Sequence, residues 1–369
     1  MKIHIVGSGA IGGMAGWHMA KNGEDVTFVD QWPEHVAAMK ERGLRITGLR
    51  GDQTIPVRAM RPEEIDEPLE LVFLACKSQH TEAAVRGIMD HLTPDSVVVS
   101  LQNGMNEDKI AALIGADHVI GALPDYTAAL VDPGHLEFTV GGPVYIGELN
   151  GTTTPRLLEV QRLLSLLTDA KLTNNIVGRV WTKQCYGCWI VMTALADAST
   201  REIWASDRNR LLSFALVREA VKVADAYGVT LEADAYFLPD LIRQTYPEAR
   251  RSQIAILQVL SDHLNRYAAT AIKPPDPDYK FVKKGSGIWW DIVYRKRQSE
   301  VRWLTGSLIE MADAVGVPMP LNKKKVSMIY EIEDGTRPMR WENLDELADY
   351  ARELGEPLAV EDPVPVHTA

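Results

Sequence analysis

The chain has 369 residues, of which 46% are hydrophobic and 24% are charged, and its formal net charge at pH 7 is −11. This length and composition are typical of a globular protein with two domains. The acidic balance argues against nucleic acid and anionic membrane surfaces as partners, because both are bound through clustered Lys and Arg.

Membrane and secretion signals are not evident in the sequence. No segment reaches the run of about 18 apolar residues that a membrane span requires. The first residues have the pattern of a buried strand, not that of a secretory signal. The cysteines, Cys76, Cys185 and Cys188, are too few for a disulfide framework. We therefore expect a cytoplasmic protein without a membrane span.

The first half of the chain alternates apolar runs with segments of helical periodicity. Runs typical of buried strands occur at residues 2–7, 25–30, 69–76, 96–103 and 118–123. Helical segments separate several of them, which predicts a doubly wound, mainly parallel sheet in an α/β domain. The stretch "HLEFTVGGPVYIGE" (135–148) is expected to form a hairpin that turns at its paired glycines.

The pattern changes near residue 176. From residue 177, "VGRVWTKQCYGCWIVMTALADAS" begins a series of apolar-periodic helices that continues to about residue 355. We predict an α/β domain over 1–176 and an all-α domain over 177–369. The pair "CYGC" (185–188) has the spacing of metal and redox sites, but no second pair accompanies it. Buried packing is the favoured interpretation, and no metal site is expected.

The segment "KIHIVGSGAIGGMAGWHMAKNG" (2–23) places a GxGxxG pattern between a predicted strand and a predicted helix. In a Rossmann domain the first glycine permits a tight turn, the second lets the backbone approach a pyrophosphate, and the third lets helix and strand pack closely. The helix N-terminus then faces the phosphates. A glycine turn without a ligand is the alternative. The residues expected to hold the dinucleotide are Gly7, Ser8, Gly9, Ala10, Ile11 and Gly12.

The acidic residue Asp30 ends the second predicted strand. A carboxylate at this position accepts hydrogen bonds from the adenosine ribose and repels the extra phosphate of NADP. The next residues, "QWPEH", contain no Lys or Arg to offset that repulsion. The sequence therefore favours NAD over NADP, and the alternative is that Asp30 only caps a turn.

Five further stretches, read together behind the glycine pattern, resemble the ketopantoate reductase family (2-dehydropantoate 2-reductases). They are "ACKSQ" (75–79), "SLQNGMNE" (100–107), "RVWTKQCYG" (179–187), "GSGIWWD" (285–291) and "RKRQSEV" (295–301). The resemblance covers nearly the whole chain. It implies an N-terminal Rossmann domain, a C-terminal helical domain, and reduction of a 2-oxo acid to a 2-hydroxy acid by hydride from a nicotinamide.

The resemblance also implies the catalytic residues. Lys183 falls where the family keeps its catalytic lysine, and an ammonium there can stabilise the oxyanion that forms and deliver its proton. Asn103 lies in the "QNG" loop near the nicotinamide and substrate. Glu300 most resembles a glutamate that hydrogen-bonds the substrate, and it is one residue farther from Asp291 than the family pattern has it.

Binding residues are implied in the same way. Lys77 matches a lysine after the fourth strand and is expected at the cofactor and the substrate carboxylate. Ser286 and Asp291 match the serine and aspartate of a substrate-binding segment. Tyr186 is expected to replace part of a polar contact, because Gly187 stands where the family usually has an asparagine, one helical turn from Lys183.

These departures favour a substrate other than ketopantoate, one that is bulkier or aromatic. Trp289 and Trp290 lie beside the implied site, although core packing is the usual role of large aromatic residues. The leading prediction is an NAD-dependent 2-hydroxy acid dehydrogenase with a small 2-oxo or 2-hydroxy acid as partner. The alternatives are a dehydrogenase for another hydroxy acid or an opine, and an NAD(H)-sensing protein without turnover. The helical half is the candidate surface for a homodimer.

Overall fold

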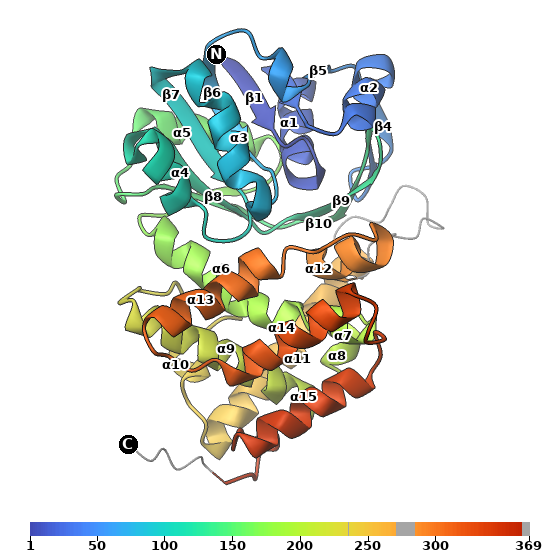
Figure 1. Cartoon of the computed structure of the whole chain (residues 1–369), viewed down its shortest axis with the longest axis vertical. Coiled ribbons are helices and arrows are strands. Elements are labelled where there is room, and N and C mark those ends of the chain that lie inside the picture. Colours follow the sequence, from blue (N-terminus) through green and yellow to red (C-terminus); the bar gives the residue numbers. More distant parts are fainter. Residues whose placement is uncertain (235, 271–284, 364–369) are drawn as a thin grey trace. The chain divides into compact units, whose positions relative to one another are not determined.

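The computed structural model describes residues 1–234, 236–270 and 285–363, except for the side chains of 263–270. The described chain forms two compact units, and the chain passes from the first to the second between Arg179 and Val180, inside one helix, α6 (Ile176–Ile190) (Figure 1). The first unit carries the strands, and the described part of the second is helical. The expected order of an α/β domain followed by an all-α domain is therefore confirmed.

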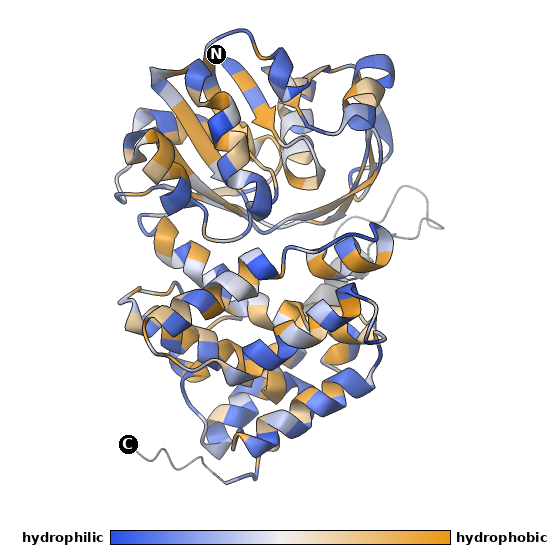
Figure 2. Cartoon of the chain, viewed as in Figure 1, coloured by the Kyte–Doolittle hydropathy of each residue, from blue (hydrophilic) through white to orange (hydrophobic). Residues whose placement is uncertain are grey.

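The main sheet of the first unit has eight strands. Its order is β12 (Ala170–Leu172), β11 (Val144–Glu148), β8 (Val119–Pro124), β7 (Leu92–Leu101), β6 (Leu69–Leu74), β1 (Lys2–Val6), β2 (Asp25–Val29) and β5 (Arg58–Met60). Neighbouring strands run parallel except β11 and β8. Figure 2 shows the strands of this sheet as largely hydrophobic, as expected for strands covered on both faces.

A second, four-stranded sheet corrects the expected hairpin. Its order is β4 (Gln53–Ile55), β3 (Leu44–Gly48), β10 (His135–Val140) and β9 (Thr127–Asp132). β10 pairs with β9 across a turn at Gly134, whereas β11 joins the main sheet, so the prediction of a hairpin over 135–148 was wrong. Gly141 and Gly142 lie in the segment that leads from β10 in the second sheet to β11 in the main sheet. A Cβ on Gly142 would lie 2.5 Å from the carbonyl oxygen of Asp125, so the site requires glycine.

In the described part of the first unit, five α-helices accompany the strands. They are α1 (Ala10–Lys21), α2 (Pro33–Arg42), α3 (Thr81–Ile88), α4 (Glu107–Ile114) and α5 (Pro155–Ser165). An apolar cluster between sheet and helices contains Val6, Val29, Leu74, Val85 and Ile110. This core fixes the strands whose carboxyl ends carry the residues discussed below.

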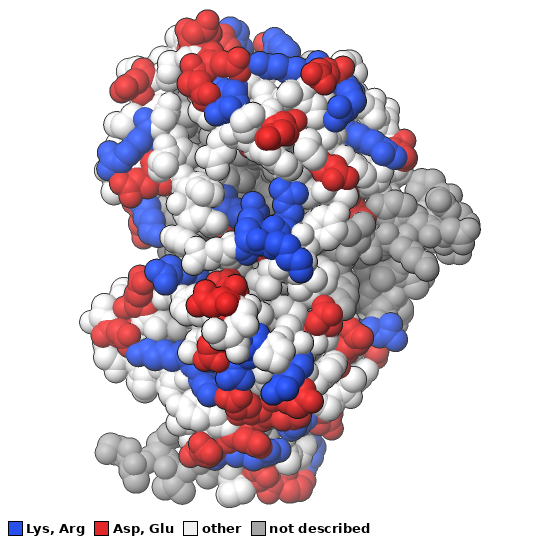
Figure 3. All heavy atoms as spheres, turned by 45° about the vertical axis from the view of Figure 1, so that its right-hand side comes forward, with Lys and Arg blue, Asp and Glu red and all other residues white. Residues whose placement is uncertain are grey.

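The second unit is built around α9 (Asp207–Ala226), most of whose residues are buried. The other helices are α7 (Thr193–Ala196), α8 (Thr200–Ile203), α10 (Pro239–Ile242), α11 (Pro247–Thr270), α12 (Gly287–Trp289), α13 (Ser307–Ala314), α14 (Pro320–Glu333) and α15 (Glu342–Glu353). Two π-helical turns cover Trp290–Tyr294 and Arg302–Gly306. No helix in the described parts of the chain is long and apolar enough to cross a bilayer. On the face in Figure 3, acidic and basic side chains are interspersed.

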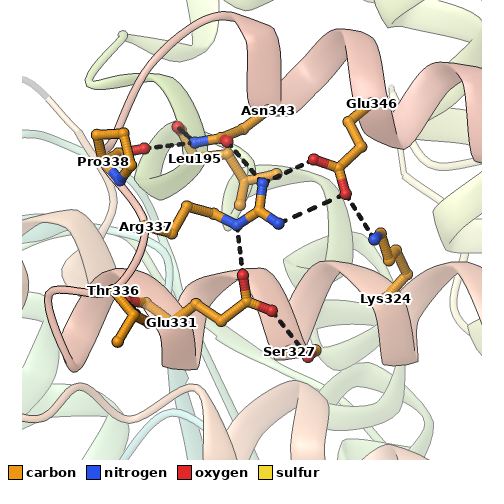
Figure 4. A network of polar contacts seen from close by, with 9 residues as sticks. All are labelled: Leu195, Lys324, Ser327, Glu331, Thr336, Arg337, Pro338, Asn343 and Glu346. Atoms are coloured by element: carbon orange, nitrogen blue, oxygen red, sulfur yellow. Dashed lines mark hydrogen bonds and ion pairs between the residues drawn. The ribbon is translucent and has the colours of Figure 1, made fainter.

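Polar contacts hold the last helices in place. Arg337 donates to Glu331 on α14 at 2.6 Å and to Glu346 on α15 at 2.7 Å, as Figure 4 shows. Beyond α15, two buried arginines bind the chain end. Arg218 of α9 contacts Glu356, and Arg250 of α11 donates to the backbone carbonyls of residues 359 and 362. The segment 356–362 is therefore part of the packed unit.

Candidate active site

The three glycines of the turn after β1 differ in their steric surroundings. Gly7 has φ +90°, and a Cβ there would lie 2.5 Å from the backbone nitrogen of Cys76. A Cβ on Gly12 would lie 2.4 Å from the carbonyl oxygen of Gly7. A Cβ on Gly9 would meet no described atom within 4 Å. Gly7 and Gly12 are therefore required by packing, whereas Gly9 leaves open space above the turn.

The residues around the glycines form the first turn of α1. Gly9 is the N-cap of this helix, and no side chain in the described structure caps it. Ala10 begins the helix, and the carbonyl of Ile11 accepts a hydrogen bond from the buried Tyr126 hydroxyl at 2.8 Å. Burial raises the pKa of Tyr126, so this phenol stays a donor. The first turn of α1 contains no acidic residue, and its amide groups suit an anion.

Ser8 faces the interior rather than the open side of the turn. Its hydroxyl is fully buried within 3.1 Å of the carbonyl oxygens of Ile5 and Val29, at the ends of β1 and β2. Ser8 can therefore contribute to a cofactor site through its backbone, while its side chain joins two strands.

His35 supports the same turn, and sequence reasoning missed it. Its Nδ1 accepts from the backbone N–H of Gly134 at 2.9 Å, so its Nε2 carries the proton and donates to the Ser8 carbonyl at 3.0 Å. The ring is completely buried and stacks on Trp32. The sequence feature that could have identified His35 as a buried residue is its place in the apolar stripe of α2, beside Val36.

Asp30 directly follows β2, as the sequence predicts. Its Oδ1 accepts from the backbone N–H of Trp32 at 3.0 Å, so the residue does cap a turn. The carboxylate is only partly buried. The hydrogen bond from Trp32 uses one carboxylate oxygen, and the other oxygen can still accept a hydrogen bond from a ribose. Turn capping and ribose binding are therefore compatible roles for Asp30.

Lys77 and Asn103 lie on two loops that are joined by hydrogen bonds. Ser78, next to Lys77, donates to the backbone carbonyl of Asn103 at 2.7 Å. Asn106 donates to the same carbonyl at 2.9 Å, and Gln102 donates to the Cys76 carbonyl at 2.8 Å. These polar links were also missed, because no local pattern shows which loops meet.

The four predicted positions of the first unit lie at one edge of the sheet. Gly7, Asp30, Lys77 and Asn103 follow β1, β2, β6 and β7, and these strands are adjacent and parallel in the order β7-β6-β1-β2. Ligands of doubly wound sheets bind outside the carboxyl ends of the strands. This edge is therefore the candidate dinucleotide site.

Lys183 lies on the partly exposed face of the later turns of α6. The partly buried positions in this part of the helix are Lys183, Tyr186, Gly187 and Ile190, whereas Gln184, Cys185, Cys188 and Trp189 are buried. Spacings of three and four residues put the first set on one stripe. Lys183 and Gly187 are therefore neighbours one turn apart, as the sequence predicts.

Ser286 is placed at the end of the same helix. Its hydroxyl accepts from the backbone N–H of Trp289 at 3.1 Å and caps α12. It also accepts from the Thr193 hydroxyl at 2.8 Å, and Thr193 contacts the carbonyl of Ile190 on α6 at 2.9 Å. Ser286 thus lies beside the C-terminal end of the stripe that carries Lys183.

Asp291 is a buried residue of the first π-helical turn, and the buried Glu300 lies two residues before the second. The Asp291 carboxylate is fully buried and accepts from Arg297 Nε at 3.0 Å. Asp291 thereby fixes the loop 295–299, which is a structural role beside the predicted substrate contact. Glu300 is buried, and its carbonyl accepts from the backbone N–H of Trp303 at 2.9 Å.

Trp289, Trp290 and the two cysteines of α6 are packing residues. Trp289 and Trp290 are buried, and Trp289 Nε1 donates to Asp197 Oδ1 at 2.7 Å. The thiols of Cys185 and Cys188 are fully buried, and this burial raises the pKa of both. Within the described parts of the chain, no group of His, Cys, Asp and Glu residues could hold a metal ion.

Comparison with known proteins agrees with this arrangement. The model of the family "Ketopantoate reductase PanE/ApbA" matches residues 3–151, and its C-terminal counterpart matches residues 175–333. A 2-dehydropantoate 2-reductase of Pyrococcus abyssi is 28% identical over 325 residues, which cover 87% of this chain and 94% of the relative.

Solved structures share the fold. D-mandelate dehydrogenase with NADH and anilino(oxo)acetate has a TM-score of 0.73 at 20% identity. The matched region covers 91% of this chain and 99% of the dehydrogenase chain. A PanE/ApbA family ketopantoate reductase from Ralstonia eutropha JMP134 has a TM-score of 0.71 at 23% identity, with the same coverage of both chains. With both halves of one family matched in order, the chain belongs to the ketopantoate reductase family.

Proposed function

We propose that this protein is an NAD-dependent oxidoreductase that interconverts a 2-oxo acid and the corresponding 2-hydroxy acid, with a substrate other than ketopantoate. Membership of the ketopantoate reductase family supports oxidoreductase chemistry on a CH–OH group. The sheet edge that carries the glycine turn supports a nicotinamide dinucleotide as the cofactor.

The residues present fit such a cofactor. The open space above Gly9 allows close approach of a pyrophosphate, and the first turn of α1 supplies backbone N–H groups. Asp30 would hold the adenosine ribose, while Lys77 and Asn103 lie on the loops after the next strands at the same edge. When bound, the nicotinamide supplies or accepts the hydride at the substrate carbon.

Lys183 is the proposed general acid and base. In reduction, negative charge grows on the substrate oxygen, and the ammonium of Lys183 stabilises it and transfers a proton to it. In oxidation, the neutral amine of Lys183 takes the hydroxyl proton. Asn103 and Glu300 are proposed to orient the substrate, and Ser286 and Tyr186 to bind it beside α6. Asp291 is proposed to act by holding the loop 295–299 through Arg297.

One observation carries most of the proposal: Lys183 lies on a partly exposed stripe of α6, and its neighbours Gln184, Cys185 and Cys188 are buried. The test is NADH oxidation with a panel of 2-oxo acids, using the parent protein and Lys183→Ala. We expect turnover by the parent and a loss of about 100-fold or more in kcat for the variant. Tight NADH binding without turnover of any 2-oxo acid would instead support the sensing protein.

The preference for NAD rests on Asp30. We expect a higher kcat/KM with NADH than with NADPH, because a carboxylate beside the ribose repels a phosphate on it. Asp30→Ala should narrow this difference, since it removes the repulsion together with the ribose hydrogen bonds. A strong preference of the parent protein for NADPH would contradict the assignment.

A further inference from the structure

We propose that His35 is a positioning residue for cofactor binding, because it sets the direction of one backbone N–H in the glycine turn. The inference rests on the proposed function, since it takes the turn after β1 as the site of the dinucleotide pyrophosphate. The His35 ring is completely buried, so it acts through another group. That group is the peptide between Ser8 and Gly9.

Two helices meet the carbonyl oxygen of the Ser8–Gly9 peptide. From α2, His35 Nε2 donates to this oxygen at 3.0 Å. From α1, a Cβ built on Gly13 would lie 2.5 Å from the same oxygen, so only glycine leaves room for it there. The ring is held in turn, because its Nδ1 accepts from the backbone N–H of Gly134 at 2.9 Å. The carbonyl is therefore directed toward a buried, fixed donor.

The direction of this carbonyl decides where the Gly9 N–H points. The described chain has no cis peptide bond, and in a planar trans peptide the N–H points opposite to the C=O. The Gly9 N–H is thus turned away from the buried His35. Gly9 is the N-cap of α1, and a Cβ there would meet no described atom within 4 Å. The first N–H groups of a helix have no intrahelical acceptor and bind anions.

The peptide before Gly9 is one that could turn over if nothing held it. Glycine adopts values of φ that other residues avoid, so its preceding peptide rotates at little steric cost. A rotated peptide would withdraw the N–H from an approaching phosphate and present the Ser8 oxygen instead, which repels an anion. The hydrogen bond from His35 opposes this rotation. His35 therefore favours the orientation that binds a pyrophosphate.

The same ring connects the glycine turn to the carboxylate proposed to hold the ribose. Asp30 Oδ1 accepts from the backbone N–H of Trp32 at 3.0 Å, and the Trp32 carbonyl accepts from the backbone N–H of His35 at 3.1 Å. The rings of Trp32 and His35 also stack, with centroids 5.9 Å apart. One side chain thus positions the groups for the ribose and the pyrophosphate relative to each other.

The experiment compares two substitutions that each keep one contact of the ring. The amide nitrogen of Gln lies about as far along its side chain as the His Nε2, and the amide oxygen of Asn about as far as Nδ1. His35→Gln can still donate to the Ser8 carbonyl, and His35→Asn can still accept from the Gly134 N–H. Each variant loses one buried hydrogen bond, so both should unfold at a lower temperature than the parent protein.

Binding of NADH, measured by fluorescence titration, should separate these two variants. His35→Asn should raise the Kd for NADH about fivefold or more, because the peptide loses the hydrogen bond that orients it. His35→Gln should keep the Kd within about twofold of the parental value. A purely structural role of His35 would instead weaken binding in both variants, in step with their melting temperatures.

A second pair of variants tests the same carbonyl from α1. Gly13→Ala should displace the Ser8 oxygen, which would lie 2.5 Å from the new Cβ, and raise the Kd for NADH by a similar factor. Gly16→Ala is the matched control in this helix, because its Cβ would lie 2.7 Å from side chains of β1 and β2 rather than from the turn. It should lower the melting temperature and leave the Kd within about twofold. If His35→Asn does not fold, this pair decides the question.

The outcomes distinguish the two levels of the argument. If the parent protein does not bind NADH, the proposed function fails and this inference fails with it. If the parent binds NADH and His35→Asn binds it equally well, the proposed function stands and the inference alone is overturned. Equal losses of NADH affinity in His35→Asn and His35→Gln, or in Gly13→Ala and Gly16→Ala, would also overturn the inference alone.

Discussion

Replacing Gly12 with alanine should lower the stability of the protein, whereas replacing Gly9 with alanine should weaken NADH binding, although both residues belong to one motif. A Cβ on Gly12 would lie 2.4 Å from the Gly7 carbonyl oxygen, 2.7 Å from the Ala75 Cβ and 2.9 Å from an Ile5 methyl group. The Gly7 oxygen is a backbone atom and the Ala75 atom is a Cβ, so neither of them can rotate away. Overpacking costs about 1–3 kcal/mol, and because these atoms cannot move away we expect the upper part of that range, about 2–3 kcal/mol, against a helix gain of about 1 kcal/mol.

The net destabilisation by Gly12→Ala is therefore expected to be about 1–2 kcal/mol, or roughly 2–8 °C in melting temperature for a unit of this size. Gly9→Ala meets no described atom and should change stability by less than about 1 kcal/mol, the usual cost of alanine at an N-cap. Its effect should appear in binding: the added methyl group enters the space above the turn, and the Kd for NADH should rise at least about tenfold.

The assays are thermal unfolding without cofactor and fluorescence titration with NADH, each on the parent and both variants. The reasoning depends on the two glycines having separable roles. It would be refuted if Gly9→Ala bound NADH as tightly as the parent protein. It would equally be refuted if Gly12→Ala unfolded at the parental temperature, because the clash would then be relieved at no cost.

Three further predictions concern single residues. Lys183→Ala should keep the Kd for NADH within about threefold while turnover falls, and a parallel loss of NADH binding would argue against a role at the substrate. The contacts of Arg337 and Lys324 lower the pKa of Glu346 to about 2, so its stabilising contribution is present above about pH 4.5 and is lost as the pH falls toward 2. Because its carboxylate is 40% exposed, Glu346→Gln should cost no more than about 1 kcal/mol at pH 7 and nothing near pH 2, as urea unfolding at both pH values would show. Lys325 is completely buried and donates to the Cys188 carbonyl at 2.6 Å, so Lys325→Ala should destabilise the protein by about 3–5 kcal/mol; a loss below 1 kcal/mol in the same assay would contradict this.

Local patterns were sufficient for the features that depend on near neighbours in the chain. The strand before Gly7, the helix after it, and the stripe from Lys183 to Gly187 each follow from spacings within one element. The pairing partner of β10 does not follow from such spacings. Both β9 and β11 lie within a few residues of β10, and only tertiary packing decides between them.

Side-chain direction was the other limit of the sequence argument. Nothing local indicates that the Ser8 hydroxyl turns into the interior, or that His35 reaches back 27 residues to bind the Ser8 carbonyl. The pairing of Asp291 with Arg297 is similar, since a carboxylate in a matched motif gives no sign of which cation it meets. These contacts depend on how loops meet, which periodicity does not encode.

The anchored chain end has a practical consequence for anyone who shortens this protein. The family match ends at residue 333, which makes the last 36 residues look dispensable. Cutting before Glu356 would remove both carbonyl acceptors of Arg250 and the carboxylate partner of Arg218, and would leave Arg218 with the Ile242 carbonyl inside a poorly hydrated interior. A truncated version designed by family limits is therefore expected to misfold.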